Sequence, residues 1–246
     1  MSAAREGPIQ HPRFSAILID LWGTLLPYAD ETARERNLAE MGRILGVDPE
    51  KFTADWIDSI GARCLGSLGS LERTVEQMAV AQGARPSSEA VRRAVELRLE
   101  FSRITHEQAE LSLAALDALR AAGFRLAVVS DSTEETVRVW PETRLSTRFE
   151  VAVFSFTERT CKPDPRMYTR ALEGLALAPA VCAYVGDGGS RELTGAEAMG
   201  LTAFKYRYPD EKRDAPRVNE DLHWTGTQLA DLRDLLHFAP GRLRPG

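Results

Sequence analysis

The first residue of this sequence with a clear chemical use is a carboxylate that follows a short apolar run. Residues 14–19 have the length and the branched side chains of a buried strand. Asp20 comes directly after them, and Gly23 and Thr24 follow closely. In an open parallel sheet, ligands bind outside the carboxyl ends of the strands. Asp20 is therefore placed to face a ligand, although a single Asp at such a position is also a common cap of a loop.

Three later apolar runs are also followed by polar residues. These are Ser130 and Asp131 after residues 124–129, Lys162 in the loop after residues 151–154, and Asp187 after residues 181–185, with Glu192 shortly beyond. Because the carboxyl ends of parallel strands lie along one edge of a sheet, we expect these side chains to converge with Asp20. Lys162 is notable because the chain has only four lysines.

The elements that position these residues alternate between strand and helix. Four helices are predicted between the apolar runs, over residues 108–122, 133–139, 166–175 and 192–199. The first of them is expected to turn Leu111 inward, and a fifth strand is expected over residues 202–205. This alternation is typical of a doubly wound parallel sheet of the α/β class, with right-handed crossovers. A last amphipathic helix is predicted over residues 227–238.

A long helical segment is inserted after the first strand. Residues 31–104 show helical periodicity, with one helix ending at Gly46 and the next opening at Asp48, a typical N-cap, followed by Pro49. A run of helices without a strand indicates a separate bundle. The predicted domains are therefore a helical bundle of residues 28–104 and an α/β core of residues 1–27 and 105–246.

Composition and charge argue against several classes of protein. The 246 residues carry a net charge of -5 without a basic stripe, which gives no support for binding nucleic acid. No stretch approaches the roughly 18 apolar residues of a membrane helix, and the polar N-terminal residues lack the pattern of a signal peptide. The three cysteines are odd in number and lack CxxC spacing, so we expect reduced thiols in a cytoplasmic protein.

Four segments of the chain, in their order and spacing, resemble the motifs of the haloacid dehalogenase-like hydrolase superfamily. They are ILIDLWGTL, LAVVSDS, CKPDPRMY and YVGDGGSRELTGAEAMGL. The resemblance covers nearly the whole chain and is to members that carry a helical cap inserted after the first motif. It implies a Rossmann-like core, a helical cap and a hydrolytic activity.

The resemblance implies a role for each matching residue in phosphoryl transfer. Asp20 would be the nucleophile that attacks phosphorus and forms an aspartyl-phosphate. Ser130 would donate a hydrogen bond to the phosphate, and Lys162 would balance the charge of the phosphate and of Asp20. Gly23 and Thr24 would let the backbone close around the phosphate with its N–H groups.

The resemblance also implies a Mg²⁺ site. Asp187 would bind the ion together with Asp20 and the main-chain carbonyl of Trp22, because Mg²⁺ prefers a few oxygen ligands and keeps several waters. Glu192 stands where the family usually has a second Asp. It would support the metal through water, or it is an ordinary acidic residue in the first turn of a helix. Asp131 stands where many members have Asn, so it must point away from the phosphate or pair with another group.

The sequence departs from the family at Trp22. Most phosphatases of the family read D-x-D-G-T, and their second Asp protonates the leaving oxygen and later activates water. An indole cannot exchange a proton in this way, and the loss of a general acid or base costs about 10²- to 10⁴-fold in rate. The most direct expectation is a Mg²⁺-dependent phosphatase, with weak proton transfer, acting on a small phosphorylated metabolite.

Other functions stay open beside the phosphatase. Dehalogenases of the family carry a Tyr where Trp22 stands, so a metal-independent 2-haloacid dehalogenase is an alternative, although Asp187 and Glu192 look like a metal motif. A phosphonate-cleaving enzyme needs a cap lysine, and only Lys51, in a position that looks solvated, is available. A non-catalytic protein that binds a ligand is the third alternative.

The helical segment offers several residues that could meet a substrate. Trp56, Arg63 and Arg34 are the candidates, but the spacing of Trp56 favours a core position, and the arginines are expected on a solvated face. We expect a small-molecule substrate, no nucleic-acid or membrane partner, and either a monomer or a homodimer.

Overall fold

The computed structural model describes residues 13–209 and 220–240 of the chain. Its centre is a sheet of six parallel strands in the order β3-β2-β1-β4-β5-β6. The strands are β1 (Ala16–Ile19), β2 (Arg125–Ser130), β3 (Val151–Phe154), β4 (Cys182–Gly186), β5 (Thr202–Lys205) and β6 (Thr227–Gln228). The order turns back on either side of β1, which confirms the doubly wound α/β fold predicted from the alternation of elements.

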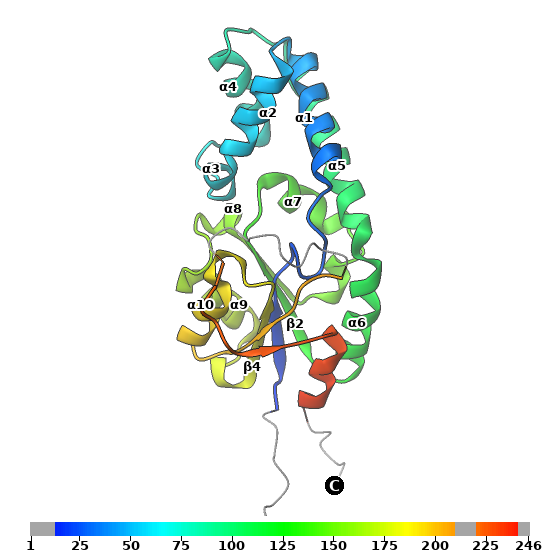
Figure 1. The fold of residues 1–246 in the computed structure, drawn as a ribbon, viewed down its shortest axis with the longest axis vertical. Coiled ribbons are helices and arrows are strands. Elements are labelled where there is room, and N and C mark those ends of the chain that lie inside the picture. The colour runs from blue at the N-terminus through cyan, green and yellow to red at the C-terminus, as the bar shows by residue number, and fades with distance from the viewer. Residues whose placement is uncertain (1–12, 210–219, 241–246) are drawn as a thin grey trace, which may run out of the picture.

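Helices cover both faces of the sheet (Figure 1). They are α6 (Glu110–Ala121), α7 (Glu134–Val139), α8 (Ser155–Glu158), α9 (Pro165–Leu175) and α10 (Glu192–Ala198). Short 3-10 turns complete the connections, namely η1 (Glu107–Ala109), η2 (Trp140–Glu142), η3 (Ser146–Arg148), η4 (Pro179–Val181), η5 (Gly189–Arg191) and η6 (Leu232–Phe238). Because successive side chains of a strand point to opposite faces, Ile17 and Ile19 of β1 pack in the cluster that includes α6, while Ala16 and Leu18 pack with α9 and α10.

The first five of the helices between β1 and β2 in the chain form what we call the helical insert, residues 31–106. They are α1 (Glu31–Leu45), α2 (Pro49–Asp58), α3 (Ile60–Cys64), α4 (Leu71–Ala81) and α5 (Ser88–His106). The predicted cap at Asp48 is present, since its side chain accepts a hydrogen bond from the N–H of Lys51, and Gly46 ends α1 in the left-handed conformation. The insert has its own apolar cluster and lies beyond one end of the sheet (Figure 1). That residues 28–104 form a domain of their own stays a prediction.

Two expectations about elements are wrong. Residues 227–238 are not one α-helix, because Thr227 and Gln228 pair with β5 as β6, and only η6 follows. The buried residues Leu229, Leu232 and Leu235 recur every three positions, a spacing that suits a 3-10 turn. In α6, Leu111 is 56% exposed. Ser112 is buried in the first turn instead.

The N-terminal residues, for which we expected no signal peptide, lie outside the described residues. Within the described ranges, no helix is both long enough and apolar enough to span a bilayer.

Candidate active site at the carboxyl ends of the strands

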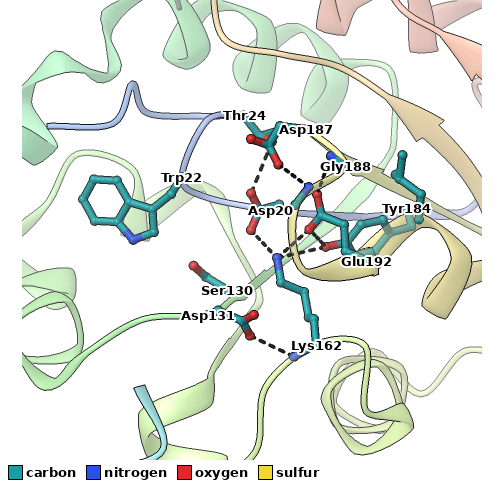
Figure 2. Close-up of polar contacts among 12 residues, drawn as sticks. Asp20, Trp22, Thr24, Ser130, Asp131, Lys162, Tyr184, Asp187, Gly188 and Glu192 are labelled. Atoms are coloured by element: carbon teal, nitrogen blue, oxygen red, sulfur yellow. Dashed lines mark hydrogen bonds and ion pairs between the residues drawn. The ribbon is translucent and has the colours of Figure 1, made fainter. Parts of the chain in front are cut away.

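The predicted convergence of charged side chains is present at the carboxyl ends of β1 and β4 (Figure 2). The Nζ atom of Lys162 lies 2.5 Å from Oδ1 of Asp20. Carboxylate oxygens of Asp20, Asp187 and Glu192 all lie within 4.8 Å of one another. All four residues are buried. Three elements far apart in the sequence thus bring three carboxylates and one ammonium group together.

The turn after β1 requires a glycine at position 23. Gly23 has φ of 76°, and a Cβ on it would lie 2.4 Å from Oδ2 of Asp187. Its N–H donates to the carbonyl of Leu26 at 2.7 Å, so it closes the turn and is not aimed at a phosphate. The hydroxyl of Thr24 lies 3.3 Å from Oδ2 of Asp20 and donates to it. Gly23 therefore allows the approach of β4 to this turn, while Thr24 orients the carboxylate.

Ser130 and its neighbours form a second group of hydrogen bonds beside Asp20. The Oγ atoms of Ser130 and Ser132 are 2.8 Å apart, and the indole N–H of Trp22 donates to Oγ of Ser132 at 3.3 Å. Asp131 accepts a hydrogen bond from the main-chain N–H of Lys162 at 2.9 Å. Asp131 thus pairs with the lysine loop, one of the two outcomes expected for it. Ser132 was not among the candidates, although a third polar residue after β2 was the signal available.

Glu192 makes contacts that sequence reasoning did not foresee. Its Oε2 lies 2.5 Å from Nζ of Lys162 and accepts a hydrogen bond from the hydroxyl of Tyr184 at 2.7 Å. Its Oε1 accepts from the N–H of Gly188 at 3.0 Å. Tyr184 is therefore a site residue that the sequence analysis missed, because a tyrosine in an apolar strand is usually read as core. The available signal was its position, three residues before Asp187.

Burial sets the electrostatics of this group. Burial raises the pKa of Asp20 to about 6, because Lys162 offsets the desolvation only in part and Asp187 adds to the rise. Burial, with the charge of Asp20, also raises the pKa of Glu192 well above its usual value. Burial opposes the charge on Lys162, but the carboxylates of Asp20 and Glu192 raise its pKa well above the usual value. The ammonium group of Lys162 is therefore charged. Its single positive charge does not neutralise the carboxylates of Asp20, Asp187 and Glu192 around it.

The residues present fit a divalent cation such as Mg²⁺. Asp20, Asp187 and Glu192 offer oxygen atoms, the ligands that this hard ion prefers. Burial and the charge of Asp187 raise the pKa of Asp20 although Lys162 lowers it, and three buried acidic groups face a single ammonium group. A cation at this place would restore the balance, so donor type and charge both favour one.

The candidate residues of the helical insert differ in burial and in the groups that they contact. Trp56 is buried as expected, and the Arg63 guanidinium lies over its ring at 4.3 Å from the centroid. The expectation of a solvated Arg63 is wrong: the side chain is buried and pairs with Glu135 of α7 at 3.1 Å. Arg34 is half-buried and pairs with a glutamate on its own helix. Lys51 is exposed and pairs with an aspartate on its own helix, as its solvated position predicted.

Comparison with known proteins gives relatives of more than one activity. The chain is 31% identical over 146 residues to the haloacid dehalogenase-like hydrolase domain-containing protein 3 of Bos taurus, covering 58% of this chain and 56% of that protein. The chain thus spans a little more than half the length of this relative. It is 29% identical over 219 residues to the phosphoglycolate phosphatase of Nitrosospira multiformis, covering 84% of this chain and 89% of that protein.

A solved structure and a family model complete the comparison. The 2-haloacid dehalogenase of Pseudomonas syringae pv. Tomato superposes with a TM-score of 0.62 at 22% identity, over 90% of this chain and 96% of that one, and this likeness shows the fold. The family model described as haloacid dehalogenase-like hydrolase matches residues 14–200. This match spans most of the chain and includes Asp20, Lys162 and Asp187. The protein belongs to the haloacid dehalogenase-like hydrolases.

Proposed function

We propose that this hydrolase is a Mg²⁺-dependent phosphatase that acts on a small phosphorylated metabolite through a phosphorylated Asp20. The observation that carries the proposal is the buried contact of 2.5 Å between Lys162 and Asp20, next to the carboxylate of Asp187. A nucleophile held against a cation and a metal-ligating acid suits phosphoryl transfer, which depends mainly on alignment and charge neutralisation. The similarity to a phosphoglycolate phosphatase supports the same reaction class.

The reaction would proceed in two displacements at phosphorus. A carboxylate oxygen of Asp20 attacks, a bond from this oxygen to phosphorus forms, and the bond from phosphorus to the leaving alcohol breaks. A water oxygen then attacks the same phosphorus, which releases inorganic phosphate and restores the carboxylate. The proton that the water loses matches the one that the leaving oxygen takes up.

The side chains around Asp20 would each do one task. Lys162 neutralises charge on the transferred group, and Ser130 donates a hydrogen bond to its oxygens. Asp20, Asp187 and the main-chain carbonyl of Trp22 would hold Mg²⁺, with Glu192 near enough for support through water. When bound, the ion supplies charge neutralisation for the phosphoryl group. Asp131 contributes by fixing the backbone of Lys162.

A 2-haloacid dehalogenase is the second candidate, because Trp22 places an aromatic residue where such enzymes carry a tyrosine, and a halide leaves without a proton. The buried carboxylates of Asp187 and Glu192 disfavour this reaction, since they add negative charge near a nucleophilic carboxylate. A phosphonate-cleaving enzyme is disfavoured because Lys51 is exposed and paired with Asp55 at 3.1 Å. A protein that binds a phosphorylated ligand without turnover is the third candidate.

One set of assays separates these functions. We expect release of phosphate from an aryl phosphate, dependent on Mg²⁺ and abolished in Asp20→Asn. Halide release from a 2-haloacid that persists in the presence of a chelator would instead establish the dehalogenase. If neither product forms while Mg²⁺ and phosphate raise the melting temperature, the protein is a binding module. The three free thiols suit the reducing cytoplasm in which we place the enzyme, as a monomer or homodimer.

A further inference from the structure

We infer that Tyr184 is a positioning residue for Lys162, acting through the carboxylate of Glu192. Figure 2 shows Lys162 between the carboxylates of Asp20 and Glu192, with the tyrosine hydroxyl beside the second of them. The inference rests on the proposed function in one respect, namely that Lys162 binds the phosphoryl group. It assigns to Glu192 a role directed at the lysine, in place of one directed chiefly at the metal.

Both oxygens of the Glu192 carboxylate are held by groups of β4 and the turn after it. The hydroxyl of Tyr184 donates to Oε2 at 2.7 Å, and the N–H of Gly188 donates to Oε1 at 3.0 Å. Burial and the adjacent Glu192 raise the pKa of Tyr184 well above its usual value, so the hydroxyl keeps its proton and acts as donor. Both oxygens of the carboxylate are thus held by donors other than the lysine.

The fold makes room for this arrangement at Gly186. A Cβ on Gly186 would lie 2.1 Å from Oε1 of Glu192, so only glycine at the end of β4 lets the longer acidic side chain reach the lysine. The main chain of Glu192 is fixed separately, because the hydroxyl of Tyr168 donates to its carbonyl at 2.8 Å. The rings of Tyr168 and Tyr184 pack edge to face, with centroids 5.4 Å apart.

The consequence for Lys162 follows from the number of its donors. An ammonium group has three N–H donors, and Asp20 and Glu192 each accept one at 2.5 Å. The hydroxyl of Tyr184 lies 3.4 Å from Nζ, the weakest of the three contacts. The third donor is therefore the one most easily turned to a phosphate oxygen. If Glu192 lost its bond to Tyr184, its Oε2 would be held less firmly, and the ammonium group of Lys162 would be oriented chiefly by its remaining bond to Asp20.

Tyr184→Phe tests the inference, with Tyr208→Phe as the control, because the Tyr208 hydroxyl also makes a hydrogen bond, to the main-chain carbonyl of Gln108 at 2.8 Å. We expect Tyr184→Phe to weaken the affinity for inorganic phosphate, measured by calorimetry in the presence of Mg²⁺, by about tenfold. We expect kcat with an aryl phosphate to fall by a similar factor. The Kd of Mg²⁺ alone is expected to stay within about twofold, as are all these constants in Tyr208→Phe.

Three outcomes would overturn the inference. The first is a Tyr184→Phe variant with unchanged phosphate affinity and kcat. The second is a loss of Mg²⁺ affinity as large as that of phosphate, which would assign Tyr184 and Glu192 to the metal. The third is an equal effect in Tyr208→Phe, which would indicate a general structural change.

Glu192→Gln provides the second variant if Tyr184→Phe does not fold. It keeps the size of the side chain and is expected to show the same selective loss of phosphate affinity. Phosphate binding does not depend on turnover, so an absence of phosphatase activity in the wild-type protein would contradict the proposed function and leave this test in place.

Discussion

At the scale of single residues, the feature that distinguishes this site is Trp22. Its indole N–H donates to Oγ of Ser132, and its ring packs edge to face against His106, with centroids 5.2 Å apart. His106 is buried, which lowers its pKa, so this neighbour is neutral at pH 7. The side chain of Trp22 is therefore held by packing and one hydrogen bond, and it offers no group that can exchange a proton with a substrate.

Trp22→Asp is expected to raise phosphatase turnover, most of all with alkyl phosphates, whose poor leaving groups need a proton. The gain expected from restoring a general acid is up to about 10²- to 10⁴-fold, and smaller with aryl phosphates. The measurement is kcat for both substrate types in the variant and in Trp22→Asn. The Asn variant removes the same ring and supplies no acid. An Asp variant that folds and is no faster than the Asn variant would show that this position does not limit the reaction.

The site residues that the sequence predicted differ from those it did not predict in their chemical type and in the sequence distance to their partners. Asp20, Lys162 and Asp187 stood out together, because polar residues that follow several parallel strands fall along one edge of the sheet. Tyr184 did not, because a tyrosine inside a strand usually packs in the core, as this one also does. Arg63 was misplaced because its partner, Glu135, lies 72 positions away, and only the fold brings the two together.

At the scale of elements, one buried ion cluster joins the helical insert to the helices around the sheet. Oε1 of Glu135, on α7, accepts from Arg63 of α3 at 3.1 Å and from Arg98 of α5 at 3.0 Å. Removing one member of such a buried cluster leaves an uncompensated charge, which is strongly destabilising. The cluster therefore fixes the insert against α7, which follows the short loop after Ser130, the last residue of β2.

Stability should depend on pH through Glu135. Burial alone would raise its pKa, but Arg63 and Arg98 lower it to about 2. Because the folded-state pKa lies below the unfolded value of about 4.5, the unfolded chain takes up the proton first as the pH falls. The stabilisation, on the order of 3 kcal/mol, is therefore present above about pH 5 and is lost between about pH 4.5 and pH 2.

Urea unfolding between pH 7 and pH 3 measures this dependence. Glu135→Gln should be less stable at pH 7, and its stability should change less over the acidic range. Glu89→Gln, which removes an exposed partner of Arg92 in the same insert, is the control and should behave as the wild type. If the free energy of unfolding of the wild type and of Glu135→Gln changed with pH in parallel, Glu135 would be excluded as the titrating group.

Elements with local signals were predictable, and those fixed by distant contacts were not. The cap at Asp48 acts within a few residues, and its helix begins at Pro49 as expected. Residues 227–238 failed because β6 exists only through its pairing with β5, which the local pattern does not reveal. The same limit applies to the insert: its helices have local signals, whereas its ion cluster with Glu135 does not.

At the scale of the whole molecule, the topology explains why the site could be foreseen. Parallel strands place all their carboxyl ends along one edge, so four separate motifs were expected to meet before any contact was known. What the sequence could not give is the balance of charge at that edge. Three carboxylates around one lysine form a group whose repulsion the folded chain must sustain, as the raised pKa of Asp20 indicates. Binding of a cation should relieve that repulsion and stabilise the whole fold.

Thermal unfolding tests this coupling between ligand and fold. Mg²⁺ with inorganic phosphate, at about 100 times Kd, should stabilise the protein by about 2.7 kcal/mol, or about 5–10 °C in melting temperature. Potassium chloride at the same ionic strength is the control. In Asp187→Asn we expect the shift to disappear while the ligand-free protein melts at an equal or higher temperature, since one buried negative charge is gone. A shift that survives this substitution would place the cation elsewhere, and no shift in the wild type would remove the metal from the proposed mechanism.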